Sequence, residues 1–285
     1  MVGASLLSLA VWGLKLGIDF TGGSLLEVSF ASSVPNTDDI QNALQTLQLD
    51  TIVVQPVGDH GVIIRMKHID EETHQKILVA LAALTSEKDV TELRFDTIGP
   101  TIGRELRNRS MSAIVLASVM IVVYIGWAFR HVSEPVSSWK YGVVAVLALV
   151  HDVTIPPGVF AFLGRFYGIE IDALFITALL TVMGFSVHDT IVVFDRIREN
   201  LRKIKKAEPY AETVNRSINE TIVRSINTSC TVLLVLGAIF FLGGETTRHF
   251  SLVLILGIIF GTYSSIFVAS PLLVVWNQLR SKKKH

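Results

Sequence analysis

The chain has 285 residues, half of them hydrophobic, and its 25 basic and 25 acidic residues give a formal net charge of zero. This composition argues against a soluble protein and leaves room for several membrane spans plus one small soluble domain. The single cysteine, Cys230, excludes an intramolecular disulfide and a thiolate metal cluster.

The first apolar run, Val2–Leu16, is shorter than the roughly 20 residues that a membrane-spanning helix needs. It also lacks the basic flank that is expected before a first span. We therefore expect residues 1–16 to be a truncated first transmembrane helix. A signal peptide is the weaker alternative, because a basic amino-terminal region and a small-residue cleavage site are missing.

The segment 24–110 alternates between the hydrophobic periods of strands and of helices. The predicted elements, in chain order, are a strand at Ser24–Phe30, a helix at Asp38–Leu47, strands at Thr51–Val57 and Gly61–Met66, a helix at Glu71–Leu84 and a strand at Val90–Ile98. This β-α-β-β-α-β order predicts a ferredoxin-like domain with two helices on one face of an antiparallel sheet. The histidines of this segment share no metal-ligand spacing, and we expect them to be solvated surface residues: His60, His68 and His74.

Five further apolar runs, all within residues 111–277, predict membrane-spanning helices. They are Ser112–Phe129, Tyr141–Leu163, Asp172–Phe194, Ser229–Leu242 and Phe250–Trp276. The fourth run needs upstream residues from about Ile222 to reach a full span of ~20 residues. With the first helix, the predicted fold is a membrane bundle of six transmembrane helices that carries an external α+β ferredoxin-like domain.

Basic residues gather on one side of these spans, whereas the short loops of the other side carry only Arg165 and Arg248. The basic side should be cytoplasmic. We therefore expect a multi-pass membrane protein with both termini in the cytoplasm, including the basic tail 278–285. The segment 24–110 should then lie outside. The basic side comprises Arg130, Lys140, Arg196, Arg198, Arg202, Lys203, Lys205, Lys206, Arg216, Arg224, Arg280 and Lys282–Lys284.

Within the cytoplasmic segment 195–228, four apolar residues recur every four positions. This period predicts an amphipathic helix at the membrane surface. The residues are Val214, Ile218, Ile222 and Ile226.

Two pairs of ionisable residues lie inside predicted spans, His151 with Asp152 and His188 with Asp189. Ionisable groups in hydrocarbon are costly, and they usually face a protein interior or a water-filled path for protons, ions or substrates. We therefore predict a role in proton transfer. The alternative for Asp189 is that it is hydrogen-bonded within an ordinary helix contact and has no role in transport.

The helix around His188 also carries small and polar residues on one face, at spacings of four, three and four residues. Such a stripe should pack against other helices rather than lipid. Its members are Thr177, Thr181, Gly184 and His188.

Three further features lie near these residues. Arg224 is charged at any relevant pH and is either a fixed countercharge for Asp189 or an anchor for its helix end. Pro156 and Pro157 predict a kink after Asp152, either water-lined or a simple packing bend. The Gly257-x-x-x-Gly261 motif in the last span predicts close helix packing.

Three stretches carry a resemblance to one known family. They are Gly17-Ile18-Asp19-Phe20-Thr21-Gly22-Gly23, then His151-Asp152, then the run from Gly184 to Asn200, which includes His188, Asp189, Asp195, Arg196 and Arg198. Together they resemble SecF of the SecD/SecF protein-export family, over about residues 17–269. The family's fold, with relatives among the RND exporters, has six helices around an external ferredoxin-like domain.

The resemblance implies an accessory subunit of the Sec translocon in the bacterial inner membrane, which uses the proton-motive force to promote protein translocation. It places the family's proton-carrying aspartate on Asp189 and its coupled arginine on Arg224. His188 is a departure, because many members have asparagine there. This histidine either titrates near neutral pH or fills the same space.

The implied partners are SecD, as a separate or fused chain, the Sec translocon channel, the translocating polypeptide and membrane lipid, without nucleic acid. We expect no enzyme activity, metal or cofactor, and the sequence contains no G-x-x-x-x-G-K-[ST] phosphate loop. The alternatives are half of an RND-type proton-coupled small-molecule exporter, which would usually need a second homologous half, and a non-conducting scaffold for the Sec channel.

Overall fold

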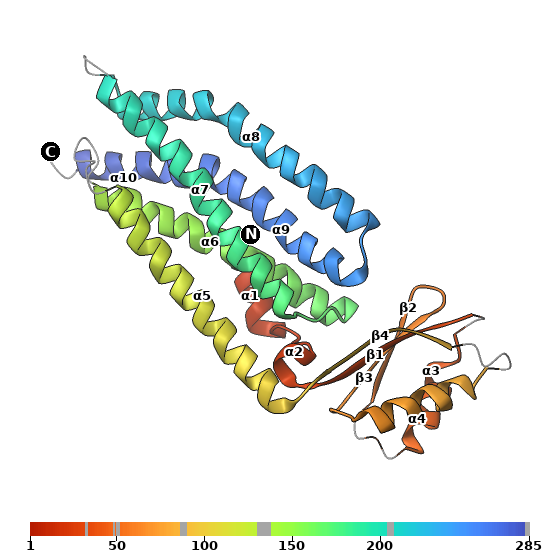
Figure 1. The fold of residues 1–285 in the computed structure, drawn as a ribbon. Coiled ribbons are helices and arrows are strands. Elements are labelled where there is room, and N and C mark those ends of the chain that lie inside the picture. The colour runs from red at the N-terminus through yellow and green to blue at the C-terminus, as the bar shows by residue number, and fades with distance from the viewer. Residues whose placement is uncertain are drawn as a thin grey trace. The chain divides into compact units, whose positions relative to one another are not determined.

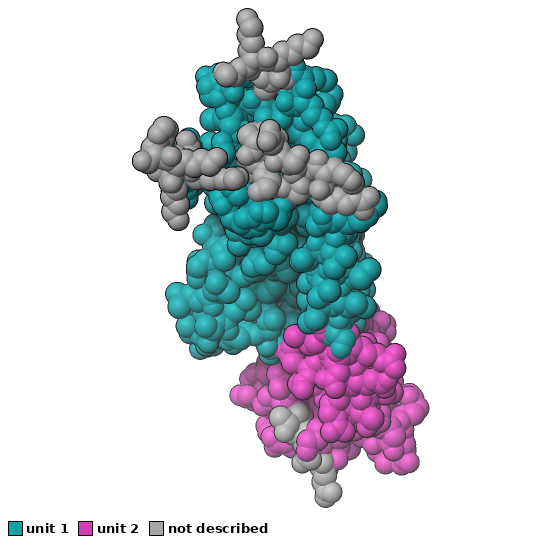
Figure 2. All heavy atoms as spheres, turned by 90° about the vertical axis from the view of Figure 1, so that its left-hand side faces the viewer, with its two compact units in different colours: residues 1–15, 112–285 teal, residues 16–111 magenta. Residues whose placement is uncertain are grey.

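The structure is a computed structural model that describes residues 1–31, 34–47, 49, 52–85, 90–129, 138–203 and 208–282. The chain divides into two compact units (Figure 2). The membrane unit comprises residues 1–15 and 112–285, and the sheet unit comprises residues 16–111. Five basic residues used to predict orientation lie outside the described residues: Arg130, Lys205, Lys206, Lys283 and Lys284.

The sheet unit contains the predicted elements in their predicted order. After the short helix α2 (Ile18–Thr21) come β1 (Gly23–Phe30), α3 (Thr37–Gln45), β2 (Val53–Val57), β3 (Gly61–Met66), α4 (Glu71–Ala82) and β4 (Val90–Ile98). The strands form one antiparallel sheet in the order β2-β3-β1-β4 (Figure 1). Thr51, the predicted start of β2, lies outside the described residues.

The core of this unit lies between the sheet and its two helices. Strand β1 alternates in burial, as a strand with one covered face should, and its inward residues Leu26, Val28 and Phe30 are buried. They belong to one hydrophobic cluster with residues of both helices, so α3 and α4 cover the same face (Figure 1). The helix residues are Ile40, Leu44, Ile77 and Leu81.

The paired glycines Gly22 and Gly23 join α2 to β1 in backbone conformations that other residues rarely adopt, with φ of 73° and 137°. A Cβ on Gly22 would lie 2.7 Å from the Cα of Pro100, and one on Gly23 would lie 2.8 Å from the carbonyl oxygen of Met66. The neighbouring Phe20 is buried. This part of the family motif therefore holds the two ends of the sheet unit's chain close together.

His74 differs from its prediction as a solvated residue. Its side chain is buried on the sheet-facing side of α4, where its ring stacks on Phe95 with centroids 3.8 Å apart. Its Nδ1 lies 3.2 Å from Glu71 and its Nε2 lies 3.2 Å from Glu92. The helical spacing of His74 with Ile77 and Leu81 explains its burial. His60 and His68 are exposed, as predicted.

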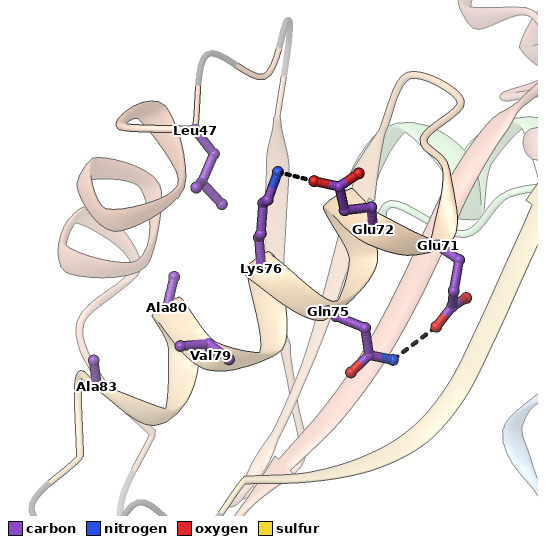
Figure 3. Close-up of a pocket in the computed structure, with 8 residues that line it drawn as sticks. All are labelled: Leu47, Glu71, Glu72, Gln75, Lys76, Val79, Ala80 and Ala83. Atoms are coloured by element: carbon purple, nitrogen blue, oxygen red, sulfur yellow. Dashed lines mark hydrogen bonds and ion pairs between the residues drawn. The ribbon is translucent and has the colours of Figure 1, made fainter.

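The opposite side of α4 borders a shallow apolar groove of about 650 Å³ (Figure 3). An ion pair between Lys76 and Glu72 crosses one turn of the helix at 2.7 Å. The lining residues are Leu47, Glu71, Glu72, Gln75, Lys76, Val79, Ala80 and Ala83. The groove is thus made by the face of α4 that does not contact the sheet.

Asp70 caps α4, and we expect this cap to fail in acid. The side-chain and backbone hydrogen bonds that it accepts from Thr73 lower the pKa of Asp70, and the backbone bond is 2.9 Å long. The cap therefore stabilises the unit above the unfolded pKa of about 3.9 and is lost as the pH falls through the lower folded value. The protection factor of the Thr73 amide against hydrogen exchange should fall over that acid range in the parent, whereas D70A should show low protection at every pH. An equal pH dependence in D70A would contradict the assignment, and D39A serves as a control on α3.

Helix α5 (Pro100–Ala128) begins in the sheet unit and continues into the membrane unit from Ser112. The membrane unit also contains helices α1 (Val2–Trp12), α6 (Ser138–Tyr167), α7 (Ala173–Lys203), α8 (Tyr210–Leu242) and α9 (Glu245–Ser264), followed by the π-helix η1 (Ser265–Ala269) and α10 (Ser270–Lys282). Five stretches of the described residues are long and apolar enough to cross a membrane, which confirms the five predicted spans. They are Pro100–Ala128, Trp139–Tyr167, Ala173–Lys203, Tyr210–Leu242 and Thr247–Leu279.

Helix α1 is shorter than these spans, yet it packs closely on α6. Ser5 and Ser8 are buried, and the hydroxyl of Ser8 donates to the carbonyl of Gly158 at 2.8 Å. Trp12 makes edge contacts with Phe162 and Phe166. Small residues that let two helices approach are typical of membrane interfaces.

Helix α8 runs without a break from Tyr210 into the fourth span, so the predicted amphipathic residues lie on the same helix as that span. Within the predicted cytoplasmic segment 195–228, residues 195–203 therefore form the end of α7, and residues 210–228 form the first part of α8. Of its four periodic apolar residues only Val214 is buried, and Ile226 is 45% exposed. Hydroxyl residues line the buried face instead: Ser217, Thr221, Ser225 and Ser229. Lipid is as apolar as isoleucine, so a membrane bundle gains little by burying apolar side chains and packs on small and polar ones.

Candidate functional site

Asp152 lies on α6 at the centre of a hydrogen-bonded cluster and is fully buried. His151 Nδ1 lies 2.8 Å from its Oδ1. Its Oδ2 accepts hydrogen bonds from the hydroxyls of Ser186 on α7, at 2.5 Å, and Ser264 on α9, at 2.6 Å. The carboxylate thus joins three helices. Helix α6 continues through Pro156, which cannot donate to the carbonyl of Asp152 in the helical ladder.

Asp189 occupies a second cluster on α7 and is 7% exposed. The hydroxyl of Ser225 on α8 donates to its Oδ1 at 2.8 Å, and that of Ser265 in η1 donates to its Oδ2 at 2.9 Å. Among the described residues, Arg224 forms no ion pair with Asp189, and its side chain is exposed. The donors to this carboxylate are therefore neutral hydroxyl groups.

The two clusters are connected through neighbouring residues. Ser264 and Ser265 are consecutive, and each donates to a different carboxylate. Ser186 and Asp189 are three positions apart in the sequence and lie on one face of α7. A π-helix begins at Ser265, and single π-helical turns often occur at functional sites.

His188 and the stripe of small and polar residues on α7 lie on the opposite side of that helix from the clusters. All four stripe residues are exposed in this chain, and the hydroxyl of Thr181 donates to its own helix at Thr177. Of the residues predicted for proton transfer, the structure brings His151 to Asp152 and places Asp189 beside them. His188 and Arg224 lie outside the hydrogen-bonded clusters.

The motif residues near the end of α7 tie this helix to α8. Arg196 pairs with Glu199 at 2.6 Å and with Glu220 at 2.5 Å. The buried Asn200 donates to Ser217 at 3.0 Å and to Glu220 at 2.7 Å. Asp195 and Arg198 form a looser pair of 3.8 Å along the helix. The contacts of Arg196 and Asn200 with Glu220 and Ser217 connect α7 to α8 at this end.

Arg224 borders a polar hollow of about 400 Å³ next to this motif. Both α7 and α8 contribute to its lining: Ile191, Val192, Asp195, Arg196, Glu199, Glu220, Thr221 and Arg224. The hollow gives the guanidinium a polar environment away from Asp189.

Four serines that donate to the carboxylates were not predicted from the sequence: Ser186, Ser225, Ser264 and Ser265. For Ser225 the available signal was the four-residue period of hydroxyl residues on α8, which the apolar period of the same helix obscured. Among the described residues, no group of three or more histidine, cysteine or acidic side chains is arranged to hold a metal ion.

These features define a multi-span membrane protein with two carboxylates buried at its helix contacts. The family model for the protein export membrane protein SecD/SecF, C-terminal, matches residues 79–279, and the model for the SecD/SecF GG motif matches residues 7–34. The chain therefore belongs to the SecD/SecF protein-export family.

Similar proteins include two named protein translocase subunit SecF. The one from Thermobaculum terrenum is 47% identical over 278 residues, which cover 94% of this chain and 86% of the relative. The one from Anaerolinea thermophila is 42% identical over 278 residues, with coverage of 97% and 89%.

Two solved structures are also similar. The crystal structure of SecDF, a translocon-associated membrane protein from Thermus thermophilus, matches with a TM-score of 0.82 and 36% identity, over 97% of this chain and 36% of that chain. SecDF in its super-membrane-facing form matches with a TM-score of 0.66 and 35% identity, over 99% and 38%. The chain thus spans little more than a third of the SecDF polypeptide.

Proposed function

We propose that the chain is an accessory subunit of the Sec translocon that uses the proton-motive force to promote protein translocation. The observation that carries the proposal is Asp189, a membrane-buried carboxylate with hydroxyl donors in a protein-export family. A hydroxyl can donate to a carboxylate and accept from a carboxylic acid. Such surroundings suit a group that is protonated and deprotonated in turn.

The energetic scale supports proton coupling. A membrane potential of 100 mV supplies ~2.3 kcal/mol for each elementary charge that crosses, before any pH gradient is added. A few protons are enough to bias a conformational equilibrium of a few kcal/mol.

SecD is the proposed partner within the membrane, as a separate or fused chain. The exposed stripe at Thr177, Thr181, Gly184 and His188 supports this pairing, because small and polar residues within a span favour helix contacts over lipid. The SecDF structures support it as well, since this chain covers only part of that polypeptide. The Sec channel, the translocating polypeptide and membrane lipid complete the proposed partners.

The finer architecture is part of the same proposal. The sheet order β2-β3-β1-β4 with both helices on one face supports a ferredoxin-like external domain. The close packing of α1 on α6 supports α1 as part of a sixth membrane helix. We place both termini in the cytoplasm of a bacterial inner-membrane protein, and we assign no catalytic chemistry to the chain.

Export into inverted membrane vesicles tests the proposal. Vesicles that contain this chain and SecD should export a model substrate faster than vesicles that lack either, and a protonophore should remove the difference. Co-purification with SecD and the Sec channel should accompany the activity. Stimulation that survives the protonophore would contradict proton coupling, and stimulation without SecD would contradict the partner.

Arg224 is expected to act through its charge. A positive charge that approaches Asp189 favours release of the proton, and Arg224 lies apart from Asp189 in this structure. R224K should therefore retain part of the proton-dependent stimulation of export, whereas R224M should lose it. R216M is the control, because Arg216 pairs with Glu208 at 3.1 Å. Equal export by the parent, R224K and R224M would reduce Arg224 to a helix anchor.

A further inference from the structure

Ser264 and Ser265 each have two acceptors for one hydroxyl hydrogen. Ser264 Oγ lies 2.6 Å from Asp152 Oδ2 and 3.1 Å from the carbonyl oxygen of Gly261. Ser265 Oγ lies 2.9 Å from Asp189 Oδ2 and 3.0 Å from the carbonyl oxygen of Thr262. Both serines are fully buried. Each hydroxyl can therefore donate its hydrogen either to the carboxylate or to the backbone carbonyl three residues before it.

Because a second acceptor is available to each hydroxyl, each carboxylate can take up a proton without leaving a buried group unpaired. A carboxylic acid donates where the carboxylate accepted. The serine oxygen then accepts from the acid, and its own hydrogen turns to the carbonyl. A buried group without a partner would cost about 1–3 kcal/mol, and this exchange avoids that cost.

The two exchanges are not independent, because the serines are consecutive in a tightly packed helix. A Cβ on Gly261 would lie 3.4 Å from the Cβ of Ser186 and 3.7 Å from Asp152 Oδ2, so α9 lies directly against both neighbours here. The hydroxyl of Ser270 also donates to the carbonyl of Ser265 at 2.9 Å, which holds the π-helical turn. A backbone movement that changes the hydrogen bond between Ser264 and Asp152 must therefore also change the hydrogen bond between Ser265 and Asp189.

We propose that Ser264 and Ser265 are positioning residues that couple the protonation of Asp152 to that of Asp189. The inference deepens the proposed proton-coupled function and rests on it. Protonation of Asp152 releases Ser264 toward Gly261, shifts the start of η1 and alters the hydrogen bond from Ser265 to Asp189. The junction of α9 and η1 therefore transmits the state of one carboxylate to the other.

The junction of α9 and η1 is the direct link between Asp152 and Asp189, because the neighbouring titratable or charged groups do not connect the two carboxylates. The titratable or charged groups that directly adjoin the two aspartates or their four serine donors in sequence are His151 on α6, His188 on α7, Arg224 on α8 and Tyr263 on α9. Of these, His151 alone contacts a carboxylate, and it belongs to the Asp152 cluster. No charged side chain bridges Asp152 and Asp189 in the described residues.

Infrared titration of the full chain with SecD in lipid vesicles tests the coupling. The carbonyl band of protonated aspartic acid is recorded against pH, and D189N identifies the contribution of Asp189. In the parent background, D152N should displace the titration midpoint of Asp189 by about one pH unit or more, the size that marks interacting sites. In S264A/S265A, adding D152N should leave the midpoint of Asp189 unchanged.

Two variants separate coupling from the simple loss of a donor. S225A removes a donor to Asp189 outside the junction, and it should keep the displacement caused by D152N. S264T/S265T retains both hydroxyls and should also keep it. If S264A/S265A does not fold, the single variants S264A and S265A provide the same comparison.

An equal displacement with and without the two hydroxyls would overturn the proposal, as would no displacement in the parent background. The infrared readout does not depend on export. If the parent shows coupling between Asp152 and Asp189 but no proton-dependent export, the proposed function alone is contradicted. If the parent shows proton-dependent export but no such coupling, this inference alone is contradicted.

Discussion

Replacing Asp189 with asparagine is expected to leave the protein folded and to abolish the proton-dependent part of export. The amide has nearly the shape of the carboxyl group, and its oxygen can still accept one of the hydrogen bonds from Ser225 and Ser265. It cannot take up and release a proton. Export into inverted vesicles should therefore fall to the rate seen with a protonophore, a loss of the whole stimulation rather than a fraction of it.

The matched control for D189N is D172N at the start of the same helix. Asp172 accepts a hydrogen bond from the backbone amide of Phe175 at 2.9 Å, and asparagine caps helices as well as aspartate does. D172N should export at the parent rate. Full export by D189N in vesicles with parent amounts of SecD complex would refute the assignment of Asp189 as the proton carrier.

The positions of the carboxylates were predictable from sequence, whereas their partners were not. An aspartate within an apolar run is visible to any reading of composition, because its burial cost is local. Which hydroxyls surround it depends on how α6, α7, α8 and α9 are rotated against one another. Ser225 and Ser265 are distant in sequence from Asp189 and from each other, and only their packing unites them.

Helix α8 shows that an apolar period has a different meaning in a membrane bundle than in a water-soluble domain. In water an apolar stripe faces the core, and in the sheet unit this rule correctly placed β1, α3 and α4. In a membrane the outside of the bundle is apolar too. Ile226 can therefore face outward while Ser225 and Ser229 face inward. Only Val214 of the four periodic apolar residues is buried, so the apolar period alone does not identify the face of α8 that contacts the bundle.

His74 illustrates the reverse case, a polar residue on a core-facing helical position. Its spacing to Ile77 and Leu81 predicts burial, and the carboxylates of Glu71 and Glu92 make that burial tolerable. Glu92 lies on β4, so the contact could be known only once α4 had been placed beside that strand. From its residue type alone, His74 was predicted to lie on the surface.

Substitution of valine for Gly257 is expected to damage the site although Gly257 touches neither carboxylate. A Cβ at this position would overlap the side chain of Val182, which is buried on α7. Overpacking of a buried contact typically costs about 1–3 kcal/mol. Gly257 lies two turns before Ser264, and Val182 lies on the face of α7 that carries Ser186 and Asp189. Separating the helices here should weaken the serine hydrogen bonds to both carboxylates.

Thermal unfolding in detergent and the export assay together test this packing prediction. G257V should lower the unfolding midpoint and the rate of export. The matched control is G237V on α8, because a Cβ there meets no heavy atom within 4 Å. Adding V182A to G257V should recover part of the loss, since it frees the space that the new side chain needs and the two positions are in contact. Equal behaviour of G257V and G237V, or no recovery with V182A, would mean that the contact between α7 and α9 at this level does not position the serines.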